Sequence, residues 1–444
     1  MEQPRKVLLF GDIVIPSGFG RIGAAVGRYL VASGYQVIGV CVQYDGLLPY
    51  SLPFFVAGVN GKDFGQTLTG VASWFRPDVV VSLQDFPYHD MAHHATGIDW
   101  STTAHVGITP VDGLPIYSKW LNLVPKLDGF MTISEFGVQG FKDAGVQAEL
   151  CPPGVDTNEF KRLPDDTRAA LRAKLGIPAE GFVVGMMAMN QGRKDFPAMI
   201  EGFWKGLKDI PNAYLFLDCE KVSPAGWDIP DSLLRVLGVD PARIRFKEDA
   251  QRNGVVGLNE RYNLLDLHAV IAHREGFGLP HVEAMATGIP SMAIDYCSGR
   301  EIIGMNERGC LIKALPGRIG TWGGAQDYNA DIDDLATQLR QMVEQPEERK
   351  ARGARALAWA QQRTWSDMAA RVEKVISRAI DKRAGDLARK NGLVTPPTMP
   401  QQQQSPAPAG LNPQIVINGN VFVQAQNPGE MGEKLTQLVE SEKK

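Results

Sequence analysis

The sequence predicts an α/β protein with two doubly wound parallel-sheet domains, a cleft between them and a small C-terminal tail. Three observations support this fold class. Short apolar runs alternate with helical stretches, a join rich in proline and glycine at Cys151–Phe160 separates two such series, and 444 residues with 44% hydrophobic content suffice for two cores. Strands that are buried on both faces of a parallel sheet are apolar throughout, as these runs are.

The first series of apolar runs predicts one sheet and begins with a glycine-rich turn. We expect strands at 6–10, 36–42, 78–83, 104–108 and 129–133. A helix should follow the first strand, with Gly18 and Gly20 allowing the backbone to approach a sugar or a diphosphate and Arg21 directly behind. Gly18 to Gly23 also has the G-x-G-x-x-G spacing of a dinucleotide site, but the acidic residue expected after the second strand is not evident, since Asp45 comes late.

The second series predicts another sheet and then a helical region. We expect strands at 182–188, 213–217, 244–246, 269–272 and 290–294. Residues 330 to 386 are typical of helices, with Trp359 and Trp365 packing as core residues. The predicted units are an N-terminal domain at 1–160, a second domain at 161–365, a helix crossing back at 366–391, a flexible Pro/Gln-rich linker at 392–412 and a tail at 413–444.

The tail has a sequence pattern of its own. Gln414–Val423 gives two β runs around Asn418-Gly419, which is a favoured hairpin turn, and a helix is expected at about 430–440. A lone hairpin is marginally stable in water. We therefore expect the tail at 413–444 to dock on a partner or on another copy of the chain.

The most informative motif lies in the second domain, where two glutamates stand eight positions apart. Glu275 lies in a turn after a buried strand, and Glu283 falls about one turn into the helix that follows. Gly278 permits unusual backbone conformations, and Pro280 suits a first helical turn. Amides at a helix start face an anion well, and carboxylates accept hydrogen bonds from hydroxyl groups. The motif thus predicts a nucleotide-sugar pocket.

The segment Glu275–Pro290 resembles the Glu-x7-Glu signature of retaining glycosyltransferases of the GT-B fold, in the large family numbered four. The resemblance implies two Rossmann-like domains, an acceptor side at 1–160 and a nucleotide-sugar donor side at 161–365. It also implies that Glu275 lies beside the donor sugar and that Glu283 binds the ribose. The family's contacts with sugar and phosphate would come from Phe277, Gly278 and Leu279. Cys151–Phe160 resembles the family's interdomain segment.

Two cations follow the first strand of the second domain. Arg193 and Lys194 could neutralise a diphosphate leaving group as its negative charge builds. The family usually carries an arginine about five residues before its lysine, and here that position holds Met189. In the first domain, many members place a histidine at a strand end facing the sugar. Here Asp112 is the candidate for that position, with Asp85 as a second, because His105 falls inside the strand.

Composition narrows the remaining classes. A net charge of −4 gives no general attraction to nucleic acid, and five widely spaced cysteines together with the absence of a leader-like start favour a reducing cytoplasm. We expect no transmembrane segment. His89 and His93 could share a metal on a helix, but no third ligand is apparent, and Asp331-x-Asp333 suits a helix start. We therefore expect metal-independent transfer, without a cofactor beyond the nucleotide-sugar donor.

Two alternatives to a retaining glycosyltransferase stay open. One is another GT-B enzyme, an epimerase or a phosphorylase, although a phosphorylase cofactor lysine is not identifiable. The other is a catalytically silent nucleotide-sugar-binding or assembly subunit, which Met189 and the tail suggest. The sequence does not specify the donor sugar, its nucleotide or the acceptor, which could be a polysaccharide, a lipid, a protein or a modified nucleic acid.

Overall fold

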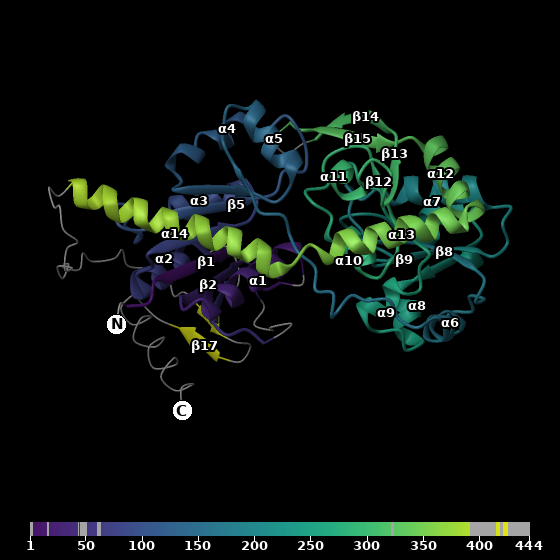
Figure 1. Cartoon of the computed structure of the whole chain (residues 1–444), viewed down its shortest axis with the longest axis horizontal. Helices are drawn as coiled ribbons and strands as arrows, with labels where there is room; N and C mark the ends of the chain where they lie inside the picture. Colours follow the sequence, from purple (N-terminus) through teal and green to yellow (C-terminus); the bar gives the residue numbers. More distant parts are fainter. Residues whose placement is uncertain are drawn as a thin grey trace.

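The computed structural model describes residues 3–15, 17–42, 44, 51–59, 64–320, 324–390, 414–417 and 421–424. Two lobes lie side by side, and each is built around a parallel sheet with helices on both faces (Figure 1). The predicted fold class of two doubly wound domains is confirmed.

The sheet of the first domain has the strand order β3-β2-β1-β4-β5-β6-β7, and these strands are all parallel. The strands are β1 (Lys6–Gly11), β2 (Gln36–Val42), β3 (Phe55–Val59), β4 (Val79–Leu83), β5 (Ala104–Thr109), β6 (Gly129–Thr132) and β7 (Glu149–Leu150). The helices are α1 (Gly18–Ala32), α2 (Phe64–Phe75), α3 (Phe86–His93), α4 (Ser118–Leu121), η1 (Val124–Lys126) and α5 (Glu135–Asp143). The sequence patterns miss β3 and β7, and β7 has only two residues.

Alternation along the strands places two different cores on the two faces of this sheet. Leu9 packs in the core that holds α1, whereas its neighbours Leu8 and Phe10 pack in the core that holds Leu68 of α2. Successive side chains of a strand point to opposite faces, so an apolar run supplies both cores at once. This is why the strands read as continuous apolar runs.

The second domain repeats the plan with the strand order β10-β9-β8-β11-β12-β13, again all parallel. The strands are β8 (Phe182–Met187), β9 (Ala213–Asp218), β10 (Ile244–Phe246), β11 (Leu267–Val270), β12 (Ser291–Ile294) and β13 (Gly309–Ile312), with an antiparallel pair β14 (Ala314–Ile319) and β15 (Gln326–Ala330) outside the sheet. The helices are α6 (Asp165–Ala173), α7 (Phe196–Leu207), η2 (Ile229–Leu234), η3 (Pro241–Arg243), α8 (Lys247–Arg252), α9 (Leu258–Tyr262), α10 (Leu279–Ala286), α11 (Gly299–Ile303), α12 (Ile332–Glu344) and α13 (Pro346–Gln361).

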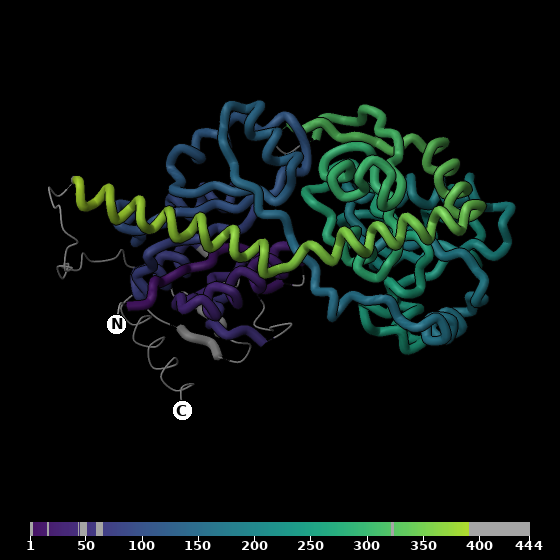
Figure 2. Tube along the Cα trace, viewed as in Figure 1, coloured from purple at the N-terminus to yellow at the C-terminus, as the bar shows by residue number. Residues whose placement is uncertain are grey.

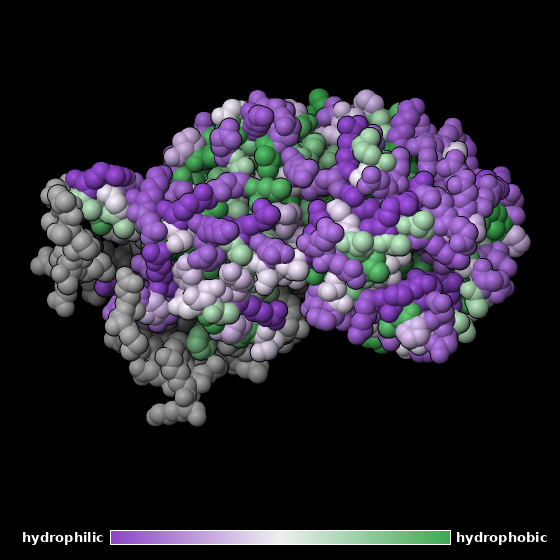
Figure 3. Space-filling view, viewed as in Figure 1, coloured by the Kyte–Doolittle hydropathy of each residue, from purple (hydrophilic) through white to green (hydrophobic). Residues whose placement is uncertain are grey.

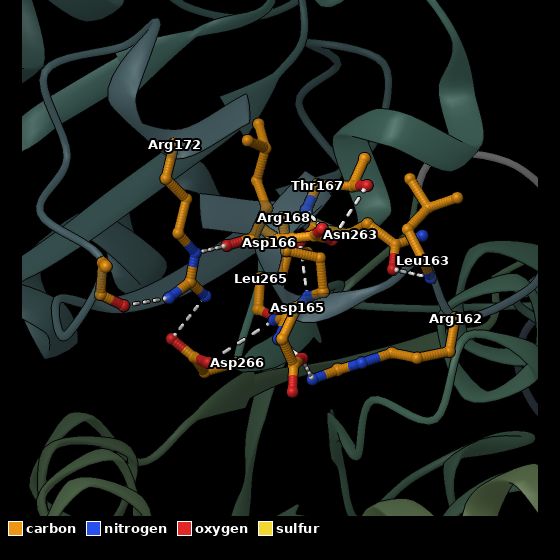
Figure 4. Close-up of polar contacts among 12 residues, drawn as sticks. Arg162, Leu163, Asp165, Asp166, Thr167, Arg168, Arg172, Asn263, Leu265 and Asp266 are labelled. Atoms are coloured by element: carbon orange, nitrogen blue, oxygen red, sulfur yellow. Dashed lines mark hydrogen bonds and ion pairs between the residues drawn. The ribbon is translucent and has the colours of Figure 1, made fainter. Parts of the chain in front are cut away.

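A buried arginine pair fixes the chain just before β11, the strand that leads to the glutamate motif (Figure 4). Arg168 Nε donates to Asn263 O at 2.9 Å, and Arg172 Nε donates to Leu264 O at 2.9 Å. Arg172 Nη2 also lies 2.8 Å from Asp266 Oδ2. Two buried guanidinium groups therefore satisfy the loop carbonyls and hold the entry to β11 in place.

The last long helix, α14 (Trp365–Lys390), runs back across the first domain (Figure 2). It packs against α1 and against β5. Tyr35 Oη donates to Glu373 Oε1 at 2.7 Å, and Arg378 Nη2 lies 2.6 Å from Glu149 Oε1. Trp365 is half-buried against the same core. Helix α14 thus joins the second domain to the first by packing as well as by chain connection.

The tail contributes two strands, β16 (Gln414–Ile417) and β17 (Val421–Gln424), which pair antiparallel with each other. β16 also pairs antiparallel with β3 and so extends the first sheet at its edge. These strands thus pair within the chain, and docking of the tail at 413–444 on a partner or on another copy stays a prediction. An edge strand presents unpaired backbone groups, and a tethered hairpin reaches them at high effective concentration. The predicted turn at Asn418-Gly419, the linker at 392–412 and the helix at 430–440 lie outside the described residues.

The surface of the face shown in Figure 3 is mainly hydrophilic, with small scattered apolar areas. Within the described part of the chain, no helix combines the length and the apolar character that crossing a membrane requires. All five cysteines are buried and carry free thiols.

Candidate donor site between the two domains

The loop from β11 to α10 carries Glu275 and has a fixed shape. Gly278 has φ of 90°, in the left-handed region that favours glycine, and a Cβ there would come 2.6 Å from His281 Cδ2. Ser298 Oγ donates to Glu275 O at 3.1 Å and to Phe277 O at 2.9 Å. Because its carbonyls are held from α11, the loop keeps Glu275 at one position. A small pocket beside it is lined by Glu275, His281, Tyr296, Cys297 and Ser298, among others.

Two cations from the turn after β8 converge on Glu275. Lys194 Nζ forms an ion pair with Glu275 Oε2, and Arg193 Nη1 lies 3.6 Å from the same oxygen. Arg193 Nη1 also donates to Arg274 O at 3.1 Å. Lys194 also forms an isolated antiparallel β-bridge with Ala272, so backbone hydrogen bonding connects the turn after β8 to the loop that carries Glu275. The structure thus brings together three of the predicted catalytic residues.

The electrostatics of this cluster favour the ionised carboxylate. Burial opposes ionisation of Glu275, but the charges of Lys194 and Arg193 outweigh it and hold the pKa of Glu275 at about 2. Burial lowers the pKa of Lys194, and the charge of Glu275 opposes that shift. A partly buried anion beside two cations leaves a net positive charge that can receive a phosphate.

Glu283 lies on α10 and meets the first domain. Its Oε1 forms an ion pair with Arg21 Nη1, and Tyr262 Oη donates to its Oε2 at 2.7 Å. The Arg21 guanidinium also lies 5.4 Å from the centre of the Phe160 ring. Both oxygens of Glu283 therefore have partners, and a ribose that binds there would have to replace or share one of them.

The start of α1 faces the start of α10 across the domain interface. A Cβ on Gly18 would lie 3.4 Å from Leu279 Cδ1, so Gly18 borders the candidate site. Gly20 is required by the turn before α1 and not by the second domain, because a Cβ there would lie 1.8 Å from Ile15 O. Phe277 is only 3% exposed, so its ring packs inside the protein and is not open to a ligand.

Asp112 lies on the first-domain side of the interface. Its Oδ1 is 3.8 Å from Arg274 Nη1, and its carbonyl oxygen accepts from Cys297 Sγ at 2.9 Å. Leu114 N donates to Tyr296 Oη at 3.0 Å nearby. Loop residues after β5 thus join the two domains next to Glu275.

Sequence patterns missed several of these contacts. Tyr262 and Ser298 carry no local signal for a site, since α9 and α11 bring them to the glutamates only in the folded chain. His105, which the sequence places inside a strand, is buried in β5. Among the residues that the structure describes, no group of three His, Cys, Asp or Glu side chains is arranged to hold a metal ion.

Comparison with known proteins relates the segment that carries this site to a protein family. Residues 254–317, which include the loop and both glutamates, match the model of the family described as glycosyl transferases group 1. The chain is related to the group 1 glycosyltransferases. The resemblance that Glu275–Pro290 indicates is thereby confirmed.

Curated relatives include a protein named as a glycosyltransferase and one named as a synthase. D-inositol 3-phosphate glycosyltransferase from Kineococcus radiotolerans is 29% identical over 243 residues, which cover 53% of this chain and 53% of that protein. Mannosylfructose-phosphate synthase from Agrobacterium fabrum is 29% identical over 152 residues, covering 32% of this chain and 31% of that protein. The chain spans about half the length of the first of these.

Solved structures share the whole fold. Sucrose-phosphate synthase from Thermosynechococcus elongatus superposes with a TM-score of 0.68 at 14% identity, covering 85% of this chain and 100% of that one. HepE from Anabaena, solved in complex with UDP-glucose, gives a TM-score of 0.66 at 18% identity, covering 84% of this chain and 99% of that one. These likenesses show the GT-B fold.

Proposed function

We propose that this chain transfers a sugar from a nucleoside diphosphate sugar to an acceptor hydroxyl, with retention of the anomeric configuration and without a metal ion. The observation that carries the proposal is the convergence of Lys194 and Arg193 on Glu275 beside the start of α10. The family match over 254–317 supports the same reading.

The cluster suits the departure of a diphosphate. As the bond to the sugar breaks, negative charge builds on the phosphate oxygens, and Lys194, Arg193 and the amides at the start of α10 can stabilise it. Glu275 holds the two cations at this place. Binding of the donor would let phosphate oxygens share them, while the carboxylate of Glu275 accepts hydrogen bonds from sugar hydroxyls.

Retention does not require a protein nucleophile in this scheme. The leaving phosphate can take the proton of the acceptor hydroxyl while both are held on the same face of the sugar, so positioning and charge stabilisation supply the catalysis. In this scheme Lys194 and Arg193 neutralise the diphosphate in place of a metal ion, so the transfer is metal-independent.

The deciding experiment measures nucleoside diphosphate release from a panel of nucleotide sugars, with wild-type protein and with Glu275→Gln. We expect release by the wild type, also in EDTA, and loss of release in Glu275→Gln with an unchanged circular dichroism spectrum. Nuclear magnetic resonance of the product should show the donor's anomeric configuration. Inversion, or loss of release in EDTA with recovery in manganese, would overturn those parts of the proposal.

A silent binding protein gives a different result in the same assay. Met189, which stands where the family usually has an arginine, is exposed after β8 and offers no charge to a phosphate. Stabilisation of the fold by a nucleotide sugar without any release of nucleoside diphosphate would identify a binding subunit instead.

A further inference from the structure

A buried polar network lies beneath the loop that carries Glu275. His268 belongs to β11, His281 to α10 and Ser291 to β12, and each of the three is at most 2% exposed. Ser291 Oγ lies 2.6 Å from His281 Nδ1 and 2.7 Å from His268 Nδ1. One serine hydroxyl thus connects two imidazole rings that come from different elements. We call His268, His281 and Ser291 the imidazole network.

The ring of His281 turns its other edge towards the donor site. A Cβ at Gly278 would lie 2.6 Å from His281 Cδ2, 3.4 Å from His281 Nε2 and 3.4 Å from Glu275 Cγ. The Cδ2–Nε2 edge of the ring and the side chain of Glu275 therefore border the same space, which the glycine leaves open. His281 N also donates to Gly278 O at 3.0 Å, and His281 and Glu275 both line the small pocket beside the loop.

The protons of the imidazole network follow from the number of donors in it. Burial lowers the pKa of His281 to about 4 and the pKa of His268 well below its ordinary value, so both rings are neutral at neutral pH and each carries one N–H. Ser291 has a single hydroxyl proton. Because His268 O, at 3.5 Å, is a poorer acceptor than a ring nitrogen, that proton goes to one ring, and the other ring donates to Ser291 Oγ.

His268 decides which of the two rings donates. Among the described residues, its buried Nε2 has no hydrogen-bond partner. Buried N–H groups without a partner are rarer in proteins than buried acceptors without one, so the proton of His268 belongs on Nδ1. His268 then donates to Ser291, Ser291 donates to His281 Nδ1, and His281 keeps its own proton on Nε2. That N–H lies at the edge beside Glu275, whose negative charge favours a donor there.

Resting on the proposed function, we propose that His281 is a positioning residue of the donor site, which orients Glu275 towards the sugar of the nucleotide donor. The imidazole network fixes the ring from one edge, and the Nε2–H edge favours one orientation of the neighbouring carboxylate. A side chain that is already oriented leaves less ordering to the binding step. His281 therefore acts on the sugar part of the donor, through Glu275, and not on its diphosphate.

The test compares a nucleotide sugar with the same nucleotide without its sugar. The full chain is titrated calorimetrically with UDP-glucose, GDP-mannose and ADP-glucose and with UDP, GDP and ADP, and the pair that binds most tightly is used for the variants. His281→Asn keeps an amide near the Nδ1 position but removes the Nε2–H edge. We expect it to weaken nucleotide-sugar binding roughly tenfold or more and to change nucleoside diphosphate binding by less than about twofold.

Three more variants separate positioning from a general loss of packing. His281→Gln places an amide N–H near the Nε2 position and should bind the nucleotide sugar more tightly than His281→Asn. Ser291→Ala leaves the ring in place without its anchor and should weaken nucleotide-sugar binding selectively, which decides the matter if His281→Asn does not fold. Ser82→Ala is the matched control, because Ser82 Oγ lies 2.6 Å from His89 Nδ1 and 2.9 Å from His105 Nε2 in the first domain. Its loss should leave both affinities unchanged.

A double variant tests whether His281 acts through Glu275. In a Glu275→Gln background, His281→Asn should cause no further loss of nucleotide-sugar affinity, because one contact is removed only once. An unchanged nucleotide-sugar affinity in His281→Asn, an equal loss for the nucleoside diphosphate, or an additive loss in the Glu275→Gln background would overturn the inference. If the wild type binds no nucleotide sugar, the proposed function itself fails, and the inference that rests on it fails with it.

Discussion

Replacing Lys194 with methionine should destabilise the second domain by about 3 kcal/mol. Lys194 and Glu275 have side chains only 8% and 21% exposed, so the change strands a mostly buried carboxylate. Breaking a buried pair costs about 3–5 kcal/mol, and we expect the lower end because Arg193 stays 3.6 Å from Glu275. For a domain of this size each kcal/mol lowers Tm by about 2–4 °C, which gives a fall of about 6–12 °C.

The pH dependence gives this prediction a specific signature. The pKa of Glu275 lies at about 2, below its ordinary value of 4.5, so its contribution to stability is present above that value and is lost as the pH falls towards 2. Without Lys194, burial should raise the pKa of Glu275. The Tm gap between wild type and Lys194→Met should therefore be widest at neutral pH and narrow as the pH falls below about 5.

Thermal melts followed by circular dichroism between neutral and mildly acidic pH measure both effects. Lys205→Met in the same domain is the control, because Lys205 pairs with Asp333 at an exposed site where an ion pair contributes little. Equal Tm values for Lys194→Met and wild type at neutral pH would refute the reasoning. A gap that stays constant with pH would show that Glu275 is not the group responsible.

Three further predictions concern the domain interface and the sheet edge. Arg21→Met removes the ion pair with Glu283, so the lobes should separate more readily and the radius of gyration from small-angle X-ray scattering should increase; an unchanged radius contradicts this. Burial raises the pKa of Glu301 to about 7, so the folded chain keeps a proton that the unfolded chain releases, and stability should fall as the pH rises from 4.5 to about 7. Glu301→Gln should flatten that part of the Tm profile, and an unchanged slope would exclude Glu301 as its cause. A chain ending at residue 390 leaves β3 as an open edge and should self-associate more than the full chain in sedimentation velocity, whereas equal sedimentation would argue against edge protection by β16.

The strands that the sequence predicts are those with a strong burial signal. Leu8, Leu9 and Phe10 are all buried, and each faces one of two cores. Their apolar run therefore predicts a strand without knowledge of the strands beside it. β14 and β15 were missed because most of their residues are exposed or only partly buried and carry no apolar alternation. β13 was also missed, although it has the same length as β12, the strand with which it pairs.

The sequence by itself determined the glutamate spacing, the glycine at residue 278 that accepts φ of 90°, and the cations that follow a strand, because these depend on local backbone chemistry and on short spacing along the chain. Only the tertiary structure decided that Lys194 meets Glu275 and that Arg21 and Tyr262 occupy the oxygens of Glu283. Those contacts join residues far apart in the chain, so they depend on strand order and domain packing, which no local pattern records.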